Sequence, residues 1–147
     1  MEIETIKWEK GKIKLIDQTK LPAEFKYIYI DNLKDLWQAI KVMKVRGAPA
    51  LGAAAALGVY LGIKDSGANT VTKFKKEVDE VCGYIGSSRP TARNLFWALE
   101  RIKDIVAANQ DKTVPIIKRL IFQEAEKIIE EDRLSCRRIG SYGLRLI

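Results

Sequence analysis

The fold of this chain is decided by residues 45–63, VRGAPALGAAAALGVYLGI. From Gly47 to Ile63 the stretch has 17 residues without a charge, and alanine and glycine make up most of them. Such a run is too short and too weakly apolar for a convincing membrane span. It predicts instead a buried central helix in a soluble globular protein.

The start of this stretch has the features of an anion-binding helix start. Gly47 allows the backbone to turn without a Cβ clash, and Pro49 suits the first helical turn, where its missing N–H costs nothing. Free backbone N–H groups and the positive end of the helix dipole then face the same point as the Arg46 guanidinium. Phosphate is the usual occupant of such a place. An ordinary helix start beside a surface arginine is the alternative that the pattern leaves open.

The segments around this helix predict an α+β fold. Strand-forming residues fill the first 30 positions, and helical apolar spacing fills the rest, with Asn32, Thr70 and Thr91 as expected N-caps. The expected strands are 3–8, 12–17 and 26–30, and the expected helices are 32–44, 49–62, 70–86, 91–106 and 114–147. We therefore expect a small N-terminal antiparallel β-sheet of about three strands followed by a bundle of about five α-helices. Both form a single domain, 1–147, in which 1–30 is the β-sheet part and 31–147 is the helical part.

Composition narrows the classes of partner. The chain has 147 residues, 47% of them hydrophobic, and a net charge of +7. The last 15 residues hold four arginines and no acid, so more than half of the excess charge is local to that end. A nucleic-acid binder would more typically carry a basic stripe with interleaved aromatic residues. We expect no nucleic-acid partner, no membrane partner and, since the first residues lack an apolar signal core, a cytoplasmic location.

Residue types also limit the chemistry. The chain has no histidine, and its two cysteines, Cys82 and Cys136, have no partner at metal-ligand spacing, so we expect no metal. Cys82 belongs to an apolar helix face and is expected in the core. Cys136 lies beside two arginines, which could lower its pKa, although a structural role is the more common one. Carboxylates such as Glu124 and Glu131 lie on charge-rich helix faces and are expected at the solvated surface.

A second arginine stands at the mouth of a helix. Arg89 precedes Pro90, which disfavours a helical conformation at position 89 just before the next helix begins. A phosphate between Arg46 and Arg89 would gain charge-assisted hydrogen bonds from both guanidinium groups. Two arginines can bind a phosphosugar, but they cannot isomerise it, because arginine does not exchange a proton near neutral pH.

Four segments together resemble one family. They are IKLIDQTKLPAEFKYI, MKVRGAPALGAAAALGV, SSRPTARNLFWAL and CRRIGSYGLRLI, in this order along the chain. In these segments the chain resembles the N-terminal part of the methylthioribose-1-phosphate isomerases, which are related to the regulatory subunits of translation initiation factor 2B. The resemblance implies that Arg46, Gly47 and Ala48 form the substrate-phosphate loop and that Arg89 is a second substrate contact.

The resemblance also implies what the chain lacks. In this family the catalytic cysteine and aspartate belong to a following Rossmann-like domain, which is absent here, and Cys136 does not occupy the cysteine motif. No catalytic residue is therefore assigned in this chain, and we expect the isolated chain to be inactive. The parent protein would be a homodimer that converts 5-methylthioribose 1-phosphate to 5-methylthioribulose 1-phosphate, in the methionine-salvage branch of amino-acid biosynthesis. It would use no metal or nucleotide cofactor.

Two other functions stay open at this point. One is a regulatory protein similar to the initiation factor 2B subunits, acting through protein–protein contact. The other is the related ribose-1,5-bisphosphate isomerase. The motifs around Arg46 and Arg89 argue against the first, because a regulatory subunit would not be expected to keep both phosphate-contacting segments. Pro49 and the run from Asn94 to Trp97 favour the methylthioribose enzyme over the second.

Overall fold

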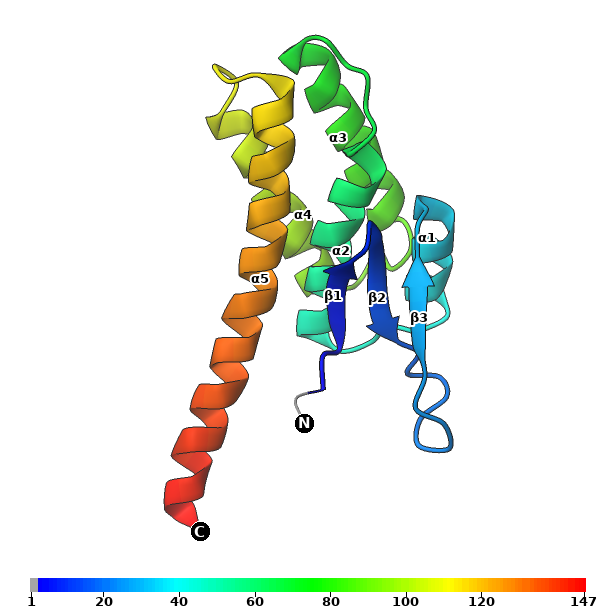
Figure 1. Ribbon diagram of the computed structural model, residues 1–147, viewed down its shortest axis with the longest axis vertical. Coiled ribbons are helices and arrows are strands. Elements are labelled where there is room, and N and C mark those ends of the chain that lie inside the picture. Colours follow the sequence, from blue (N-terminus) through cyan, green and yellow to red (C-terminus); the bar gives the residue numbers. More distant parts are fainter. Residues whose placement is uncertain (1–2) are drawn as a thin grey trace.

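The small-residue stretch forms α2, Ala48–Ile63, at the centre of the molecule, as the sequence predicts. The computed structural model describes residues 3–147. Figure 1 shows α2 behind a small sheet and among the other helices. It packs against α1, α3, α4, α5 and strands β1 and β2. Eleven of its 16 residues are buried, so this helix is the core and not a membrane span. No helix of the described residues has the length and apolar character that crossing a membrane requires.

The element order confirms the α+β class, with a sheet of three strands followed by five helices. The elements are β1 (Ile6–Glu9), β2 (Lys12–Ile16), β3 (Tyr27–Ile30), α1 (Leu33–Lys41), α2, α3 (Val71–Gly86), α4 (Arg93–Ala108), α5 (Val114–Gly143) and the 3-10 turn η1 (Leu144–Leu146).

The sheet is antiparallel with β2 in the middle. Its register aligns Ile6, Leu15 and Ile28 in one cross-strand row and places Ile13 opposite Ile30 in the next. These side chains share one face, because alternate residues of a strand point the same way, and that face is buried against the helices. The sheet is thereby tied to the helical part by a common hydrophobic core.

The first strand is shorter than expected, since it begins at Ile6 and not at Ile3. Pairing with β2 extends only to the hydrogen bond from Ile16 N–H to the carbonyl of Thr5. Beyond that point β2 has ended, because Asp17 starts a turn. Residues 3 and 4 therefore have no strand to pair with.

Two of the three expected N-caps are confirmed. The Asn32 side chain accepts from Asp35 N–H at 2.9 Å, and the Thr70 hydroxyl accepts from Lys73 N–H at 3.2 Å. The prediction for Thr91 is wrong, because α4 begins at Arg93 with Ala92 as its N-cap. Thr91 is instead a central residue of a turn closed by the hydrogen bond from Ala92 N–H to the carbonyl of Arg89. The N-terminus of α4 consequently has no side-chain cap.

Helix α1 also ends earlier than expected, at Lys41 and not at Lys44. Met43 adopts a left-handed conformation with φ of 61° and turns the chain out of the helix. The turn places Val45 in the core, where it is 1% exposed. The burial of Val45 thus determines where α1 ends and which direction the backbone takes before α2.

The buried residues of helix α5 all lie in its first half, of which Ile128 is the last. Figure 1 shows its C-terminal half, coloured orange to red, running past the rest of the molecule. The helical apolar spacing of the sequence continues through Ile139 and Leu146. In the structure these two side chains are 71% and 90% exposed. Periodicity identified the helix, but nothing described lies opposite its last turns.

One ion-pair network lies where the sequence predicted only solvated carboxylates. Arg101 of α4 donates through Nε to Glu124 and through both Nη atoms to Glu131, at 2.6 and 2.9 Å. The Arg101 and Glu124 side chains are only 20% and 14% exposed. The hydrogen bond from Arg101 lowers the pKa of Glu131 below its ordinary value of 4.5. The network therefore joins α4 to α5 through partly desolvated charges.

We expect Glu131→Gln to destabilise the protein in a pH-dependent way. A carboxyl whose pKa falls on folding stabilises the protein above its unfolded pKa, and this contribution disappears as the pH falls through the folded value. The loss in unfolding free energy should therefore be about 0.5–1 kcal/mol near neutral pH and shrink below about pH 4.5. Urea unfolding at several pH values measures it. Glu126→Gln, an exposed glutamate on the same helix, is the matched control, and a loss that does not vary with pH would contradict the assignment.

Candidate functional site

The loop before α2 has a backbone that only glycine adopts easily. Gly47 is the N-cap of α2, with φ of 95° and ψ of 134°, and its carbonyl accepts from Leu51 N–H at 2.9 Å. Pro49 lies in the first turn, as the sequence predicts. No side chain caps this helix, and Arg46 immediately before it is exposed. The first amide groups of α2 thus point out of the helix beside a guanidinium group.

The loop before α4 also carries an arginine and leads to a helix without a side-chain cap. Arg89 opens the turn that ends at Ala92, its side chain is half-buried, and no side chain caps the helix that follows. Ser87 holds this loop to α1, because its hydroxyl accepts from Trp37 Nε1 at 2.9 Å. The loop is therefore fixed at both sides, by α1 and by the first turn of α4.

The two helix starts lie side by side. A Cβ built on Gly52, one turn into α2, would be 3.3 Å from the carbonyl oxygen of Asn94 in the first turn of α4. It would also be 3.8 Å from Ala98 Cβ, one turn further along α4. The absence of a side chain at position 52 is what allows this approach. The predicted site residues Arg46, Gly47, Ala48 and Arg89 accordingly belong to two neighbouring helix starts.

The electrostatics of both starts favour an anion. Neither α2 nor α4 has an acidic residue in its first turn. Within residues 3–147, neither Arg46 nor Arg89 pairs with a carboxylate. The two neighbouring positive helix ends therefore each follow an arginine that has no counter-ion from the described chain.

Sequence reasoning missed Gln18, which holds the Arg46 loop in place. The Gln18 backbone N–H donates to the carbonyl of Lys44 at 2.8 Å, and its side-chain Nε2 donates to the carbonyl of Arg46 at 3.0 Å. Gln18 follows β2 and is 28 positions from Arg46. No local pattern in the sequence signals a contact over that distance.

The cysteines do not lie among these residues as reactive groups. Cys82 is buried in α3, and burial raises the pKa of its thiol to about 12, so it stays protonated. This confirms the expected core position. Cys136 is exposed on the projecting half of α5, with its Sγ 3.9 Å from an Asp132 carboxylate oxygen.

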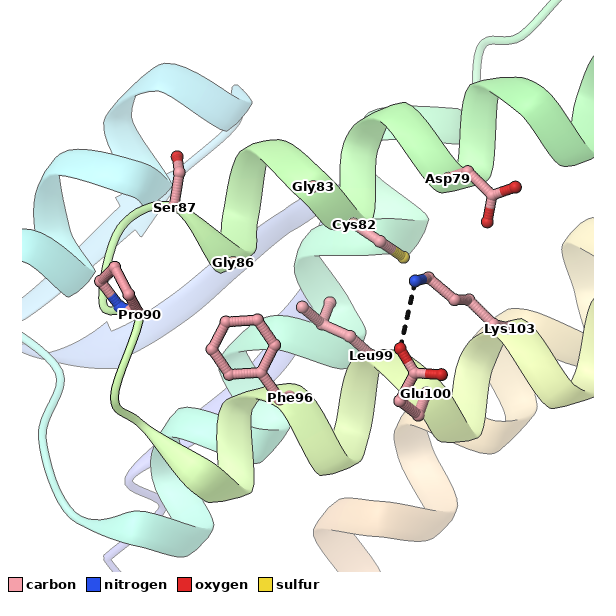
Figure 2. Close-up of a pocket in the computed structure, with 10 residues that line it drawn as sticks. All are labelled: Asp79, Cys82, Gly83, Gly86, Ser87, Pro90, Phe96, Leu99, Glu100 and Lys103. Atoms are coloured by element: carbon pink, nitrogen blue, oxygen red, sulfur yellow. Dashed lines mark hydrogen bonds and ion pairs between the residues drawn. The ribbon is translucent and has the colours of Figure 1, made fainter.

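A separate open groove of about 400 Å³ lies between α3 and α4, as Figure 2 shows. Phe96 and Leu99 form its apolar wall, and Lys103 pairs with Glu100 at 3.1 Å near Cys82. Neither Arg46 nor Arg89 lines this groove. The groove borders the Arg89 loop through Ser87 and Pro90 but includes neither arginine.

Comparison with known proteins identifies relatives of two kinds. A 5-deoxyribose 1-phosphate isomerase from Moorella thermoacetica is 48% identical over 145 residues, which are 99% of this chain and 41% of that protein. The crystal structure of 5-methylthioribose 1-phosphate isomerase from Pyrococcus horikoshii OT3 superposes with a TM-score of 0.94 at 40% identity, over 99% of this chain and 41% of that one. The structure of translation initiation factor eIF-2B, subunit delta, from A. fulgidus gives a TM-score of 0.89 at 39% identity, over 99% and 42%.

These similarities cover nearly the whole of this chain but less than half of each relative. The chain spans about 41% of the length of the curated relatives that it matches. The profile of the initiation factor 2 subunit family matches residues 44–147, which include both arginine-bearing helix starts. The chain therefore belongs to the initiation factor 2 subunit family.

Proposed function

We propose that this chain is the substrate-phosphate-binding part of an aldose–ketose isomerase. Its substrate is 5-methylthioribose 1-phosphate, which the parent protein converts to 5-methylthioribulose 1-phosphate. The observation that carries the proposal is the pair of adjacent, uncapped helix N-termini, each preceded by an arginine. The homodimeric parent that the resemblance implies, and the cytoplasmic location expected from the sequence, are part of the same proposal.

Each part of the site has a role toward the phosphate. Arg46 and Arg89 donate charge-assisted hydrogen bonds to its oxygens, and the first amides of α2 add neutral donors at the positive end of the helix dipole. Ala48 has only a methyl group as its side chain, so the phosphate has room to approach the backbone. These groups bind and orient the sugar phosphate.

The hydrogen transfer between C1 and C2 needs a group that exchanges a proton near neutral pH. We assign no such role to a residue of this chain. Asp17 is a carboxylate near the Arg46 loop, but the hydrogen bond from the Thr19 hydroxyl lowers its pKa, so it stays ionised and already bonded. The isolated chain is expected to bind the sugar phosphate weakly and to leave it unchanged.

The identity of the sugar has a second candidate. The Moorella thermoacetica relative is named for 5-deoxyribose 1-phosphate. This compound and 5-methylthioribose 1-phosphate share the ribose 1-phosphate part and differ in the group on C5. A site built around the phosphate takes both, and the parent protein discriminates between them at the other end of the sugar.

Calorimetric titration of the chain with 5-methylthioribose 1-phosphate tests the proposal. We expect weak binding that is lost with the unphosphorylated sugar, because the phosphate supplies the contacts. An isomerase assay on the same chain should detect no ketose product. Equal heats with both sugars would contradict the phosphate site, and turnover would contradict the assignment of the proton-transferring groups to another part of the protein.

The similarity to subunit delta of eIF-2B supports a regulatory, non-enzymatic alternative. The same titration separates the two. A protein that acts only through contact with other proteins has no need to bind a sugar phosphate, so an absence of binding would favour that alternative.

A further inference from the structure

We infer that Gln18 is a positioning residue, which holds the Arg46 loop in the conformation that aims the Arg46 guanidinium at the phosphate. This inference rests on the proposed function. Gln18 makes two hydrogen bonds to the loop, from its backbone N–H to the Lys44 carbonyl and from Nε2 to the Arg46 carbonyl. The two acceptors lie on either side of Val45, which is anchored in the core.

These two bonds are the hydrogen bonds that tie the loop to a segment distant in the sequence, among residues 3–147. Among residues 3–147, the other backbone bonds of positions 44–47 come from their own neighbours in the chain, namely Ala39 at the end of α1 and Leu51 in α2. Arg46 is exposed, and its side chain makes no ion pair within the described part of the chain. Within residues 3–147, Gln18 therefore donates the hydrogen bonds that join the turn after β2 to this loop, beside the attraction between the Lys44 ammonium and the Asp17 carboxylate.

The hydrogen bond to the Arg46 carbonyl fixes the orientation of the peptide between Arg46 and Gly47 as well as its position. A trans peptide is planar, so its carbonyl and the following N–H point opposite ways. With the Arg46 carbonyl held toward Gln18, the Gly47 N–H points away from Gln18, and the Arg46 Cα is fixed in the same peptide plane. When the Nε2 donor is removed, this peptide can rotate. The rotation is easy because Gly47 has no Cβ to restrain it.

Gln18 can act as an anchor because its own turn is fixed. The Asp17 carboxylate is 3% exposed and accepts from Thr19 N–H at 3.1 Å and from the Thr19 hydroxyl at 2.6 Å. The Asp17 N–H donates to the Lys26 carbonyl just before β3. The turn that carries Gln18 is thus fixed to the end of the sheet. Through Gln18, the sheet orients the Arg46 loop.

The test is a double-mutant cycle with inorganic phosphate as the probe and backbone amide chemical shifts as the measure of binding. Gln18→Met keeps the size of the side chain and removes its donor. We expect its dissociation constant for phosphate to rise about 3-fold to 10-fold, the range for loss of one neutral hydrogen bond. In an Arg46→Ala background the same change should have less than about a 2-fold effect, because Gln18 acts through Arg46. The matched control is Gln110→Met, at an exposed glutamine whose Nε2 donates to the Ala107 carbonyl near the end of α4.

Each outcome decides something. A merely structural role would weaken binding equally with and without Arg46, and such additivity would overturn the inference. Unchanged phosphate binding in Gln18→Met would overturn it as well and leave the proposed function standing. If the unsubstituted chain binds no phosphate, the proposed function fails, and the inference fails with it. If Gln18→Met unfolds, Gln18→Asn replaces it, because the shorter side chain does not reach the Arg46 carbonyl. The chemical shift of the Gly47 amide is then the measurement. An unchanged shift would overturn the inference.

Discussion

Leu57→Ala is expected to destabilise the protein by about 2–5 kcal/mol, which is a large part of the total stability of a typical domain. Leu57 lies in the middle of α2 and is 0% exposed. Its neighbours are held by helices and strands on every side, so they cannot collapse fully into the space that the truncation leaves. Thermal and urea unfolding measure the loss.

The matched control is Leu146→Ala, the same truncation at a side chain that is 90% exposed. It should change the unfolding free energy by less than about 0.5 kcal/mol, because it removes no buried surface. A small effect of Leu57→Ala, similar to that of the control, would contradict the central position of α2. A large effect of Leu146→Ala would mean that the end of α5 packs against something beyond the residues described.

Arg46→Ala is expected to weaken binding of inorganic phosphate or 5-methylthioribose 1-phosphate about 10-fold to 100-fold. The range corresponds to the loss of charge-assisted hydrogen bonds worth about 1.5–3 kcal/mol. Calorimetry measures it, or amide shifts if the dissociation constant is too high for calorimetry. Arg89→Ala should have a similar effect. The double variant should lose less than the sum of both, since two arginines on one phosphate are coupled.

Arg119→Ala is the matched control for loss of one positive charge. Its neighbour Lys118 donates to the carbonyls of Lys64 and Ser66, which places this part of α5 at the far end of α2 from Arg46. The 16 residues of α2 span about 24 Å. Binding by Arg119→Ala should stay within about 2-fold of the unsubstituted chain, because the charge is more than two Debye lengths away. Equal losses in both variants would indicate a general charge effect and not a site.

The α+β class and the central helix could be predicted because their signals are local. Strand propensity and the uncharged run from Gly47 to Ile63 are each read from residues that are close together in the chain. The N-caps Asn32 and Thr70 were predictable for the same reason, since a cap bonds to an amide three positions away.

The predictions that were wrong concern competition between local signals and packing. Thr91 has the right residue type for an N-cap, but it is a central residue of the turn from Arg89 to Ala92, so the helix begins after it. Glu124 is in a charge-rich segment, and only the approach of Arg101 from α4 makes it a partly buried ion-pair partner.

By itself, then, the sequence determined which segments are helices and strands and marked two arginines, each just before a helix. Only the tertiary structure decided that the helices after Arg46 and Arg89 begin side by side, where Gly52 lets α2 approach Asn94, and that Gln18 holds the first loop. The physical reason is the distance along the chain over which each effect acts. Propensity, capping and periodicity depend on neighbours in the chain, whereas the meeting of two helix starts 45 positions apart depends on how every element between them packs.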